Sequence, residues 1–588
     1  MGARFSKYSS NREDSYLYTG TDTEIVPKTV KHVHIHPSVT TIHSNAFKEC
    51  AMLQTIRFFE NTPASLKTIK RGACTGCSNL EYINLPESVT TIEERAFENC
   101  SSLSSVFLPQ SISTIGNFCF RGCTSLTSVK LPTSMATIGY NVFGDCSSLS
   151  RITLPDTLSI IEDCAFSGCK NLVSIALPES LFTIGNYVFE GCISLASITL
   201  PVSVSTIGDS IFDGCTSLAL VNLPDSITHI GNETFCRCTA LTSIIIPYYV
   251  RTIGNYAFFE CSKLASITFS PSSITSIGYS CFAGCPSLKQ IQLPSSITQI
   301  GNSAFIGSGL ISVTLPNRLA KIERSVFKGC LGLESLTLSN YISTIEDEAL
   351  RDCPCLRFIV VSDDSISTAA ETYVSEKVKS LNQTSINLPA SITSIGCNAF
   401  SGCRAITSIN LPVSLTTVDR DVFSGCTGLV SVTLPGRVTK IERGAFKGCV
   451  SLRSIALPTS ITTIGDHSFK DCRSLTSIKL PTCIAVIGHS SFSGCVSLTS
   501  VESSISKCEY DGNYDSSSSI TTIERYAFSG CSSLAFVRLP KSVTTIERYA
   551  FSDCTRLSFI SLPESLKTIG EGAFSRCPIL ASITLPIL

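Results

Sequence analysis

The chain has 588 residues, with 45 Lys and Arg against 46 Asp and Glu, and a formal net charge of −1. Near-neutral charge with 15% charged residues gives no electrostatic basis for binding nucleic acid or an anionic membrane surface. No apolar run reaches the roughly 18 residues that a membrane-spanning helix needs, so the sequence predicts no transmembrane span.

The amino terminus carries a polar segment with an acylation pattern. Residues 1–22 contain few apolar side chains, so we expect a disordered tail. The opening M-G-x-x-x-S matches the N-myristoylation pattern with Gly2 as acceptor, and Arg4, Lys7 and Arg12 add positive charge. A single acyl chain with three basic residues predicts reversible association with the inner face of the plasma membrane. The alternative is an unmodified polar tail.

From near residue 30 the sequence repeats a unit of 23 residues, approximately I-T-T-I-G-x-x-A-F-x-G-C-x-S-L-x-S-I-x-L-P-x-S. A period this short indicates a solenoid, in which each rung, one turn of the coil, buries its apolar side only against its neighbours. Leu126, Val129 and Leu131 are core positions of one predicted strand, which Pro132 ends. The phenylalanines that mark the period are Phe97, Phe120, Phe143, Phe166, Phe189, Phe212, Phe235 and Phe258.

The L-x-x-I-x-L-P strand, the I-G-x-x-A-F segment of residues 253–258 and the cysteine after it resemble the leucine-rich repeats of the BspA-like (TpLRR) class. The resemblance covers residues 30–588. It implies an α/β solenoid, a right-handed curved coil of about 22 rungs with parallel strands on one face and short extended or helical turns on the other. It also implies surface adhesion or protein binding as the function.

The first rung contains an H-x-H-x-H pattern. Aligned with the repeat, His32, His34 and His36 face away from the core. Side chains two apart on a strand lie roughly 6.5–7 Å apart, close enough for two imidazoles to share a zinc or copper ion. The alternative is a set of exposed histidines on the end rung, with no ligand.

Thirty cysteines follow the repeat rather than a disulfide pattern. Twenty-one stand three residues after the Phe position, where only Ser308 replaces one. We therefore expect a buried column of reduced thiols. The C-x-x-C of Cys74 and Cys77 has the spacing of metal or redox chemistry, but both residues occupy core positions of the repeat, which favours packing. The column and the lack of a signal peptide favour a reducing, cytoplasmic location, with the cell surface as the alternative.

Two segments interrupt the period. Leu350 and Phe400 are 50 residues apart instead of 23, and near-helical apolar spacing between them predicts an amphipathic helix that serves as a lid or a docking element. Phe492 and Phe528 are 36 residues apart around an acidic, Ser-rich loop. Its D-x-N-x-D opening resembles a calcium loop but lacks the later glycine and glutamate, so a flexible loop is favoured. The predicted organisation is a tail (1–22), three repeat blocks (23–361, 386–501 and 519–588), a helical insertion (362–385) and a loop (502–518).

The outward strand positions are mostly Ser and Thr. Strand propensity and solubility explain such residues, and the alternative is a hydroxyl lattice for a glycan or for ice. Larger side chains at these positions are our candidates for selective ligand contacts: Phe107, Lys130, Arg151, Ile245, Gln292, Lys479 and Arg538.

The sequence contains no phosphate-binding loop and no zinc-protease motif, so we expect neither enzyme activity nor a cofactor. We predict a non-enzymatic scaffold that binds protein partners. The runner-up is a BspA-like surface adhesin for glycan or extracellular protein, and the third alternative is a metal-binding or ice-binding structural protein. The final strand, with Leu580, Ile583 and Leu585, has no polar cap after it, which predicts fraying and end-to-end self-association.

Overall fold

The computed structural model describes residues 14–21, 24–59, 64–270, 274–362, 386–503 and 520–580. Gly2, nearly all of the expected helical insertion and most of the expected acidic loop lie outside these ranges. The chain divides into two compact units, Met1–Ile274 and Thr275–Leu588. The described residues form strands and turns without a helix, and thus none that could span a bilayer.

Most repeats contribute two strands, a longer face strand and a two-residue short strand, to a coil of about 21 rungs in all. In unit 1 the face strands are β1 (Ser15–Tyr18), β2 (His32–Ile35), β4 (Thr55–Phe58), β6 (Tyr82–Asn84), β8 (Ser105–Phe107), β10 (Ser128–Lys130), β12 (Arg151–Thr153), β15 (Ser197–Thr199), β17 (Leu220–Asn222), β19 (Ser243–Ile246) and β21 (Ser266–Phe269). Its short strands are β3 (Thr41–Ile42), β5 (Thr68–Ile69), β7 (Thr91–Ile92), β9 (Thr114–Ile115), β11 (Thr137–Ile138), β13 (Ile160–Ile161), β14 (Thr183–Ile184), β16 (Thr206–Ile207), β18 (His229–Ile230) and β20 (Thr252–Ile253).

Unit 2 repeats the same arrangement. Its face strands are β24 (Ser312–Thr314), β26 (Ser335–Ser339), β28 (Phe358–Ser362), β29 (Ile386–Asn387), β31 (Ser408–Asn410), β33 (Ser431–Thr433), β35 (Ser454–Ile455), β37 (Ser477–Leu480), β39 (Ser500–Ser503), β41 (Phe536–Arg538) and β43 (Phe559–Ser561). Its short strands are β22 (Ser276–Ile277), β23 (Gln299–Ile300), β25 (Lys321–Ile322), β27 (Thr344–Ile345), β30 (Ser394–Ile395), β32 (Thr417–Val418), β34 (Lys440–Ile441), β36 (Thr463–Ile464), β38 (Val486–Ile487), β40 (Thr522–Ile523), β42 (Thr545–Ile546) and β44 (Thr568–Ile569).

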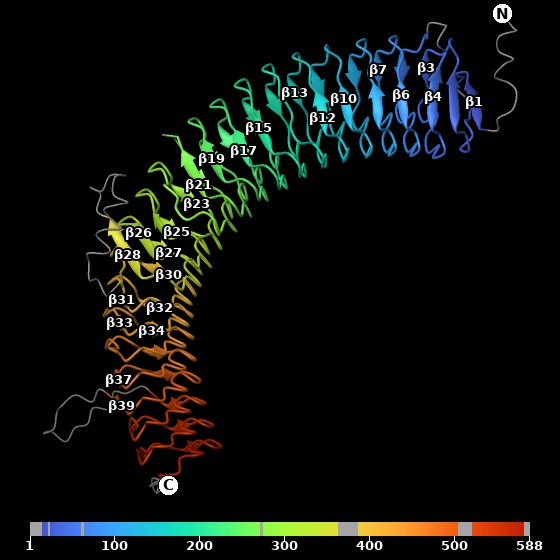
Figure 1. Cartoon of the computed structure of the whole chain (residues 1–588). Coiled ribbons are helices and arrows are strands. Elements are labelled where there is room, and N and C mark those ends of the chain that lie inside the picture. The colour runs from blue at the N-terminus through green and yellow to red at the C-terminus, as the bar shows by residue number, and fades with distance from the viewer. Residues whose placement is uncertain are drawn as a thin grey trace, which may run out of the picture. The chain divides into compact units, whose positions relative to one another are not determined.

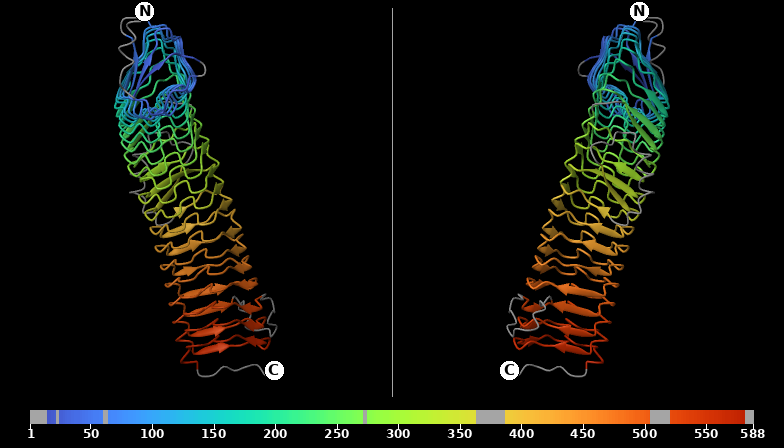
Figure 2. Two further views of the ribbon diagram at one scale, coloured as in Figure 1. Left: turned by 90° about the vertical axis from the view of Figure 1, so that its right-hand side faces the viewer. Right: turned by 90° about the vertical axis from the view of Figure 1, so that its left-hand side faces the viewer.

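Within each unit, strands of one kind pair in parallel with their counterparts in the next rung (Figure 1). The largest face sheet of unit 1 runs β1-β2-β4-β6-β8-β10-β12, and the largest sheet of short strands in unit 2 runs from β32 to β44. Figure 2 shows the successive strands of unit 2 as stacked parallel rungs. Register matches the repeat, because Ile83 pairs with Val106 and Val129 with Ile152. Equivalent side chains therefore stack on one another.

The core is a column of stacked phenylalanines. The ring centroids of Phe143 and Phe166 are 5.7 Å apart with an interplanar angle of 4°, and those of Phe189 and Phe212 show the same values. All four rings are fully buried. A 23-residue period places each ring directly over its predecessor, so the period itself builds the column.

The turn that carries each phenylalanine is not helical, because alternate N–H groups donate hydrogen bonds to the next rung and not within the turn. The N–H of Phe120 donates to the carbonyl oxygen of Val142 in the next rung at 2.9 Å, whereas the N–H of Cys123 donates to that of Phe120 at 3.1 Å. Phe118 and Gly122 have φ values of 59° and 73°. Left-handed residues break the helical ladder and turn N–H groups toward the neighbouring rung.

The cysteine column is buried except at Cys577, which is half-buried, and every described cysteine is a free thiol, as the repeat predicts. The column also forms hydrogen bonds between rungs. The Sγ of Cys146 donates to the carbonyl oxygen of Phe120 in the preceding rung at 3.1 Å, and Cys77 donates to Phe47 in the same way. Burial raises the pKa of Cys192 to about 12. Thiols whose pKa is raised by burial, such as Cys146 and Cys192, link successive rungs as neutral donors, whereas hydrogen bonds with Cys100 and Cys74 lower the pKa of Cys77.

Cys74 and Cys77 are core residues, as their repeat positions predict. Cys74 occupies the Phe position and is 1% exposed. Its carbonyl oxygen accepts a hydrogen bond from the Sγ of Cys100 at 3.2 Å. Across the described ranges, no group of three or more His, Cys, Asp or Glu side chains is placed to hold a metal ion.

The amino-terminal tail is shorter than expected. β1 lies within the predicted disordered segment 1–22 but pairs in parallel with β2. Tyr18, 1% exposed, packs edge-on against Phe47 with ring centroids 5.1 Å apart, and its hydroxyl accepts a hydrogen bond from the N–H of His43 at 3.1 Å. Sequence composition missed this strand because its one buried ring, that of Tyr18, stands outside the repeat pattern.

Candidate binding surface

Most three-residue face strands bury the central side chain and turn the two flanking side chains outward. On β10, Ser128 and Lys130 are exposed and flank Val129, which is 4% exposed. Parallel pairing places Ser128 beside Arg151 and Lys130 beside Thr153 on β12. The flanking residues thus form two columns across each sheet, which we call the strand face: the first column precedes the buried central residue and the second follows it.

All seven candidate ligand contacts are exposed, and all except Gln292 lie on the strand face. Phe107, Lys130 and Arg151 stand on the consecutive strands β8, β10 and β12, so the structure brings these three together. Ile245 lies apart on β19 in another sheet of unit 1. The other three belong to unit 2: Gln292 in a rung without an assigned face strand, Lys479 on β37 and Arg538 on β41.

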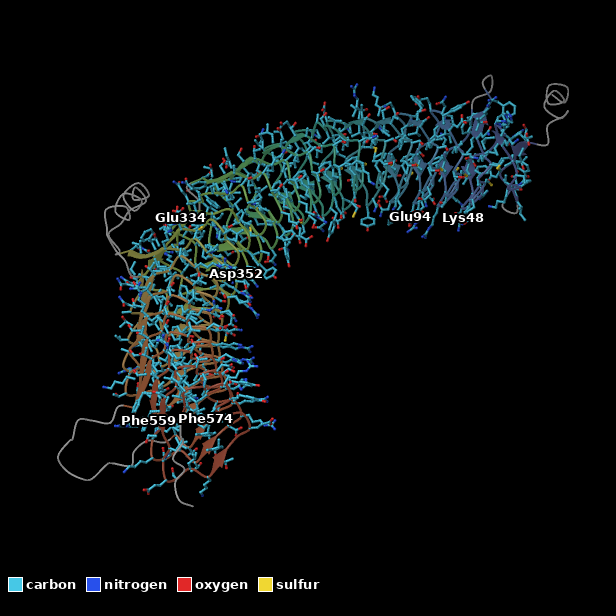
Figure 3. The ribbon with its side chains drawn as sticks, turned by 60° about the horizontal axis from the view of Figure 1, so that its bottom comes forward. Lys48, Glu94, Glu334, Asp352, Phe559 and Phe574 are labelled. Carbon is cyan, nitrogen blue, oxygen red and sulfur yellow. The ribbon has the colours of Figure 1, made fainter. Side chains whose placement is uncertain are left out.

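The first column contains apolar side chains that the sequence analysis left out. Tyr82 and Leu220 are 37% and 53% exposed in unit 1. In unit 2, the rings of Phe536 and Phe559 stack with centroids 5.0 Å apart, and the guanidinium of Arg538 lies 5.8 Å from the centroid of Phe536. Figure 3 labels Phe559. These apolar residues can be recognised in the sequence, because each replaces the Ser that the repeat usually has at this position.

The Ser and Thr hydroxyls of the repeat differ in whether they are engaged. Several outside the strand face join neighbouring rungs: Thr127 Oγ1 donates to the carbonyl oxygen of Ser104 at 3.3 Å, and Ser180 Oγ to that of Leu158 at 2.6 Å. Some on the strand face are engaged as well, since Thr199 Oγ1 accepts a hydrogen bond from Asn222 Nδ2 at 3.2 Å. On the strand face, the hydroxyls of Ser197 and Thr268 have no hydrogen-bond partner among the described residues. Their hydrogen-bonding capacity is open to solvent or to a ligand.

The cations of unit 1 also differ in whether they have a partner: some in the Phe-bearing turns form ion pairs, and some on the strand face do not. In the Phe-bearing turns, Arg95 contacts the carboxylates of Glu94 and Glu98 at 3.0 and 3.4 Å. Figure 3 labels Glu94 on this side, with Lys48 nearby. On the strand face, Lys130 and Arg151 make no ion pair with any described residue.

The three histidines of the first rung are half-buried rather than fully exposed. His32 Nδ1 lies 2.9 Å from Thr55 Oγ1, and His36 Nδ1 lies 2.6 Å from Ser38 Oγ. Burial lowers the pKa of His34, with smaller contributions from Arg57 and His32. Two imidazole nitrogens are therefore already engaged within the protein, and metal binding by this strand stays a prediction.

The repeat and the coil that it builds match a known family. The family described as BspA type Leucine rich repeat region (6 copies) matches residues 40–173, 159–272, 251–377, 374–499 and 501–587. The protein belongs to this BspA-type leucine-rich-repeat family. No match was found among curated protein sequences.

The chain is also similar to solved structures. A leucine-rich repeat protein from Bacteroides ovatus is 28% identical with a TM-score of 0.50, over 68% of this chain and 87% of that one. The T. pallidum leucine rich repeat protein TpLRR is also 28% identical, with a TM-score of 0.27, over 35% of this chain and 83% of that one. A leucine-rich repeat protein from Eubacterium ventriosum is 24% identical with a TM-score of 0.39, over 57% and 83% of the two chains.

Proposed function

We propose that the protein is a non-enzymatic scaffold that holds a protein partner on its strand face. One observation carries the proposal: at Phe107 the repeat replaces a small hydroxyl side chain with a phenyl ring that is 52% exposed, and two unpaired cations, Lys130 and Arg151, follow on the next two strands. Exposed aromatic and arginine side chains are the residues that contribute most to protein interfaces.

The rest of the coil supports a binding role for this face in particular. Elsewhere in the repeat, many hydroxyls, thiols and charges bond to the neighbouring rung, as at Thr127, Cys146 and Arg237. Only side chains left over from rung-to-rung bonding are available to a ligand without loss of stability.

Photo-crosslinking tests the proposal. A photoreactive phenylalanine analogue would replace Ser128 on the strand face and, as the matched control, Thr114 in β9, a short strand of the same unit that is also exposed. We expect defined crosslinked protein adducts in the source cell from position 128 and none from position 114. Equal adducts from both positions, or from neither, would overturn the proposal.

A second candidate is a surface adhesin for glycan, favoured by the open hydroxyls of Ser197 and Thr268. Glycan-array binding that is lost in Ser197→Val and Thr268→Val would support it.

The N-glycosylation sequons bear on the location of the protein. Among those in the described residues, Asn232 is a poor acceptor, because its Nδ2 donates to Asp209 Oδ2 at 3.2 Å and Thr234 is fully buried. Cytoplasmic location remains our prediction for the scaffold, and glycosylation at Asn99 would contradict it.

A further inference from the structure

We infer that one part of the strand face, on β4, β6, β8, β10 and β12 of unit 1, binds an acidic polypeptide segment that carries aromatic side chains. We call this part the N-terminal face, and it consists of the nine exposed flanking residues Arg57, Tyr82, Asn84, Ser105, Phe107, Ser128, Lys130, Arg151 and Thr153, because Thr55 on β4 is buried. The inference rests on the proposed function and names the chemistry of the partner.

The charge of the N-terminal face is of one sign. Its nine side chains include three cations, Arg57, Lys130 and Arg151, and no carboxylate. All three cations are exposed, and none forms an ion pair with another described residue. The nearest carboxylate along the chain, Glu81, precedes Tyr82 at the margin. In a protein with a net charge of −1, this face offers uncompensated positive charge to an anionic partner.

Two aromatic rings lie between these cations. Asn84 on β6 pairs with Phe107 on β8, and Tyr82 pairs with Ser105, so the rings stand on adjacent strands in opposite columns. Tyr82 is 37% exposed and Phe107 52% exposed. Rings placed beside unpaired cations can contact the apolar and aromatic side chains of a partner whose carboxylates neutralise the cations.

The spacing of the cations suits a polypeptide. β4 and β10 are three strand positions apart in the sheet, so Arg57 and Lys130 stand on the order of 14 Å apart. An extended segment that crosses the strands advances about 3.3 Å per residue, so carboxylates about four residues apart would reach both cations. A sulfated polysaccharide is the less suitable ligand, because its dense charge calls for a continuous run of cations where this sheet has rings and an amide.

Fluorescence anisotropy with the full-length protein at low ionic strength tests the inference. The probe is a labelled random copolymer of glutamate and tyrosine, and polyglutamate and heparin are the comparison ligands. We expect the copolymer to bind more tightly than polyglutamate. The double charge reversal Lys130→Glu with Arg151→Glu and the single change Phe107→Ser should each weaken copolymer binding by at least about tenfold.

The matched control is Lys67→Glu, an exposed lysine beside β5 in the same unit, which should leave copolymer affinity unchanged. Every changed side chain is exposed, so each variant should keep its fold. Thermal melts of each variant check this, so that weaker binding can be assigned to the changed surface. Failure of the copolymer to bind, or equal weakening by the control, overturns the inference. Heparin binding that exceeds copolymer binding and depends on the same residues also overturns it, in favour of an anionic glycan.

The two proposals fail separately. Specific crosslinking from position 128 in cells together with absent copolymer binding would contradict the acidic-partner inference and leave the scaffold standing. Copolymer binding by the purified protein without specific crosslinks from position 128 in cells would contradict the scaffold instead.

Discussion

The first rung of unit 1 and the last described rung of unit 2 carry the same residue types at the same repeat positions, yet they are buried differently. Phe47 and Cys50 are fully buried, whereas Phe574 and Cys577 are half-buried. In the first rung β1 covers the open side and Tyr18 packs on Phe47. Figure 3 labels Phe574, which stacks only on Phe551 among the described rings, at 5.6 Å. Burial in this protein depends on the neighbouring rung and not on the residue type.

High pH is expected to have the largest effect, because it acts on buried thiols all along the coil. Burial raises the pKa of Cys330 to about 11 and that of Cys531 to about 12, while an unfolded cysteine titrates near 9. Unfolded thiols therefore lose their protons first, so the contribution of each thiol to stability is complete below pH 9 and declines as pH rises through the folded pKa.

The loss is about 1.4 kcal/mol per pH unit for each such thiol. Thermal melts should show the melting temperature falling steeply between about pH 9 and about pH 11. A melting temperature that does not change over this range would mean that the thiols are not buried as described.

Removing the cap ring tests the first rung directly. Tyr18→Ala should destabilise this rung by about 3 kcal/mol, because it removes a buried ring, whereas Tyr18→Phe should cost about 1 kcal/mol through the lost hydrogen bond from the N–H of His43. Hydrogen exchange of the β2 amides is the measurement. Unchanged protection in Tyr18→Ala would show that β1 does not cap the coil.

Thiol reactivity compares the two ends in one sample. Burial raises the pKa of Cys50 to about 11, whereas a hydrogen bond from the Cys554 thiol lowers the pKa of the half-buried Cys577. Cys577 should therefore react with iodoacetamide at least about ten times faster than Cys50 at neutral pH. Peptide mapping after brief labelling measures the ratio of the two alkylation rates. Equal rates would mean that Cys577 is as well protected as Cys50.

The smallest effect is expected at the last described rung. Phe574→Ala should lower the free energy of unfolding by about 1 kcal/mol, because the ring is only partly covered. The matched change Phe551→Ala, one rung earlier and fully buried, should cost about 3–5 kcal/mol. Urea unfolding of both variants gives the comparison, and equal losses would mean that this end is covered as well as the interior.

The family, the period and the identity of the core residues could be predicted from the sequence. Phe166, Cys169 and Leu172 recur at fixed intervals, and in a coil a fixed interval means a fixed stack. The two exposed columns followed from strand alternation, which is why all seven candidate contacts are exposed. The same alternation predicts that the first-column rings of Tyr82 and Phe559 are exposed.

Other features depend on contacts that a periodic pattern does not contain. The strand at residues 15–18 became visible only through its pairing with β2, because its residues do not follow the repeat pattern. The non-helical turn at Phe120 and the thiol bond from Cys146 both use a carbonyl of an adjacent rung.

The sequence by itself therefore determined the coil, its family and which side chains point outward, because those properties depend on the local period. Only the tertiary structure decided which outward groups are already engaged. Thr127 and Ser197 are both small hydroxyl residues of the repeat, and one bonds to its neighbouring rung while the other has no partner within the described chain. That distinction arises from distances between rungs, and it separates the side chains that hold the coil together from those that remain open to a ligand.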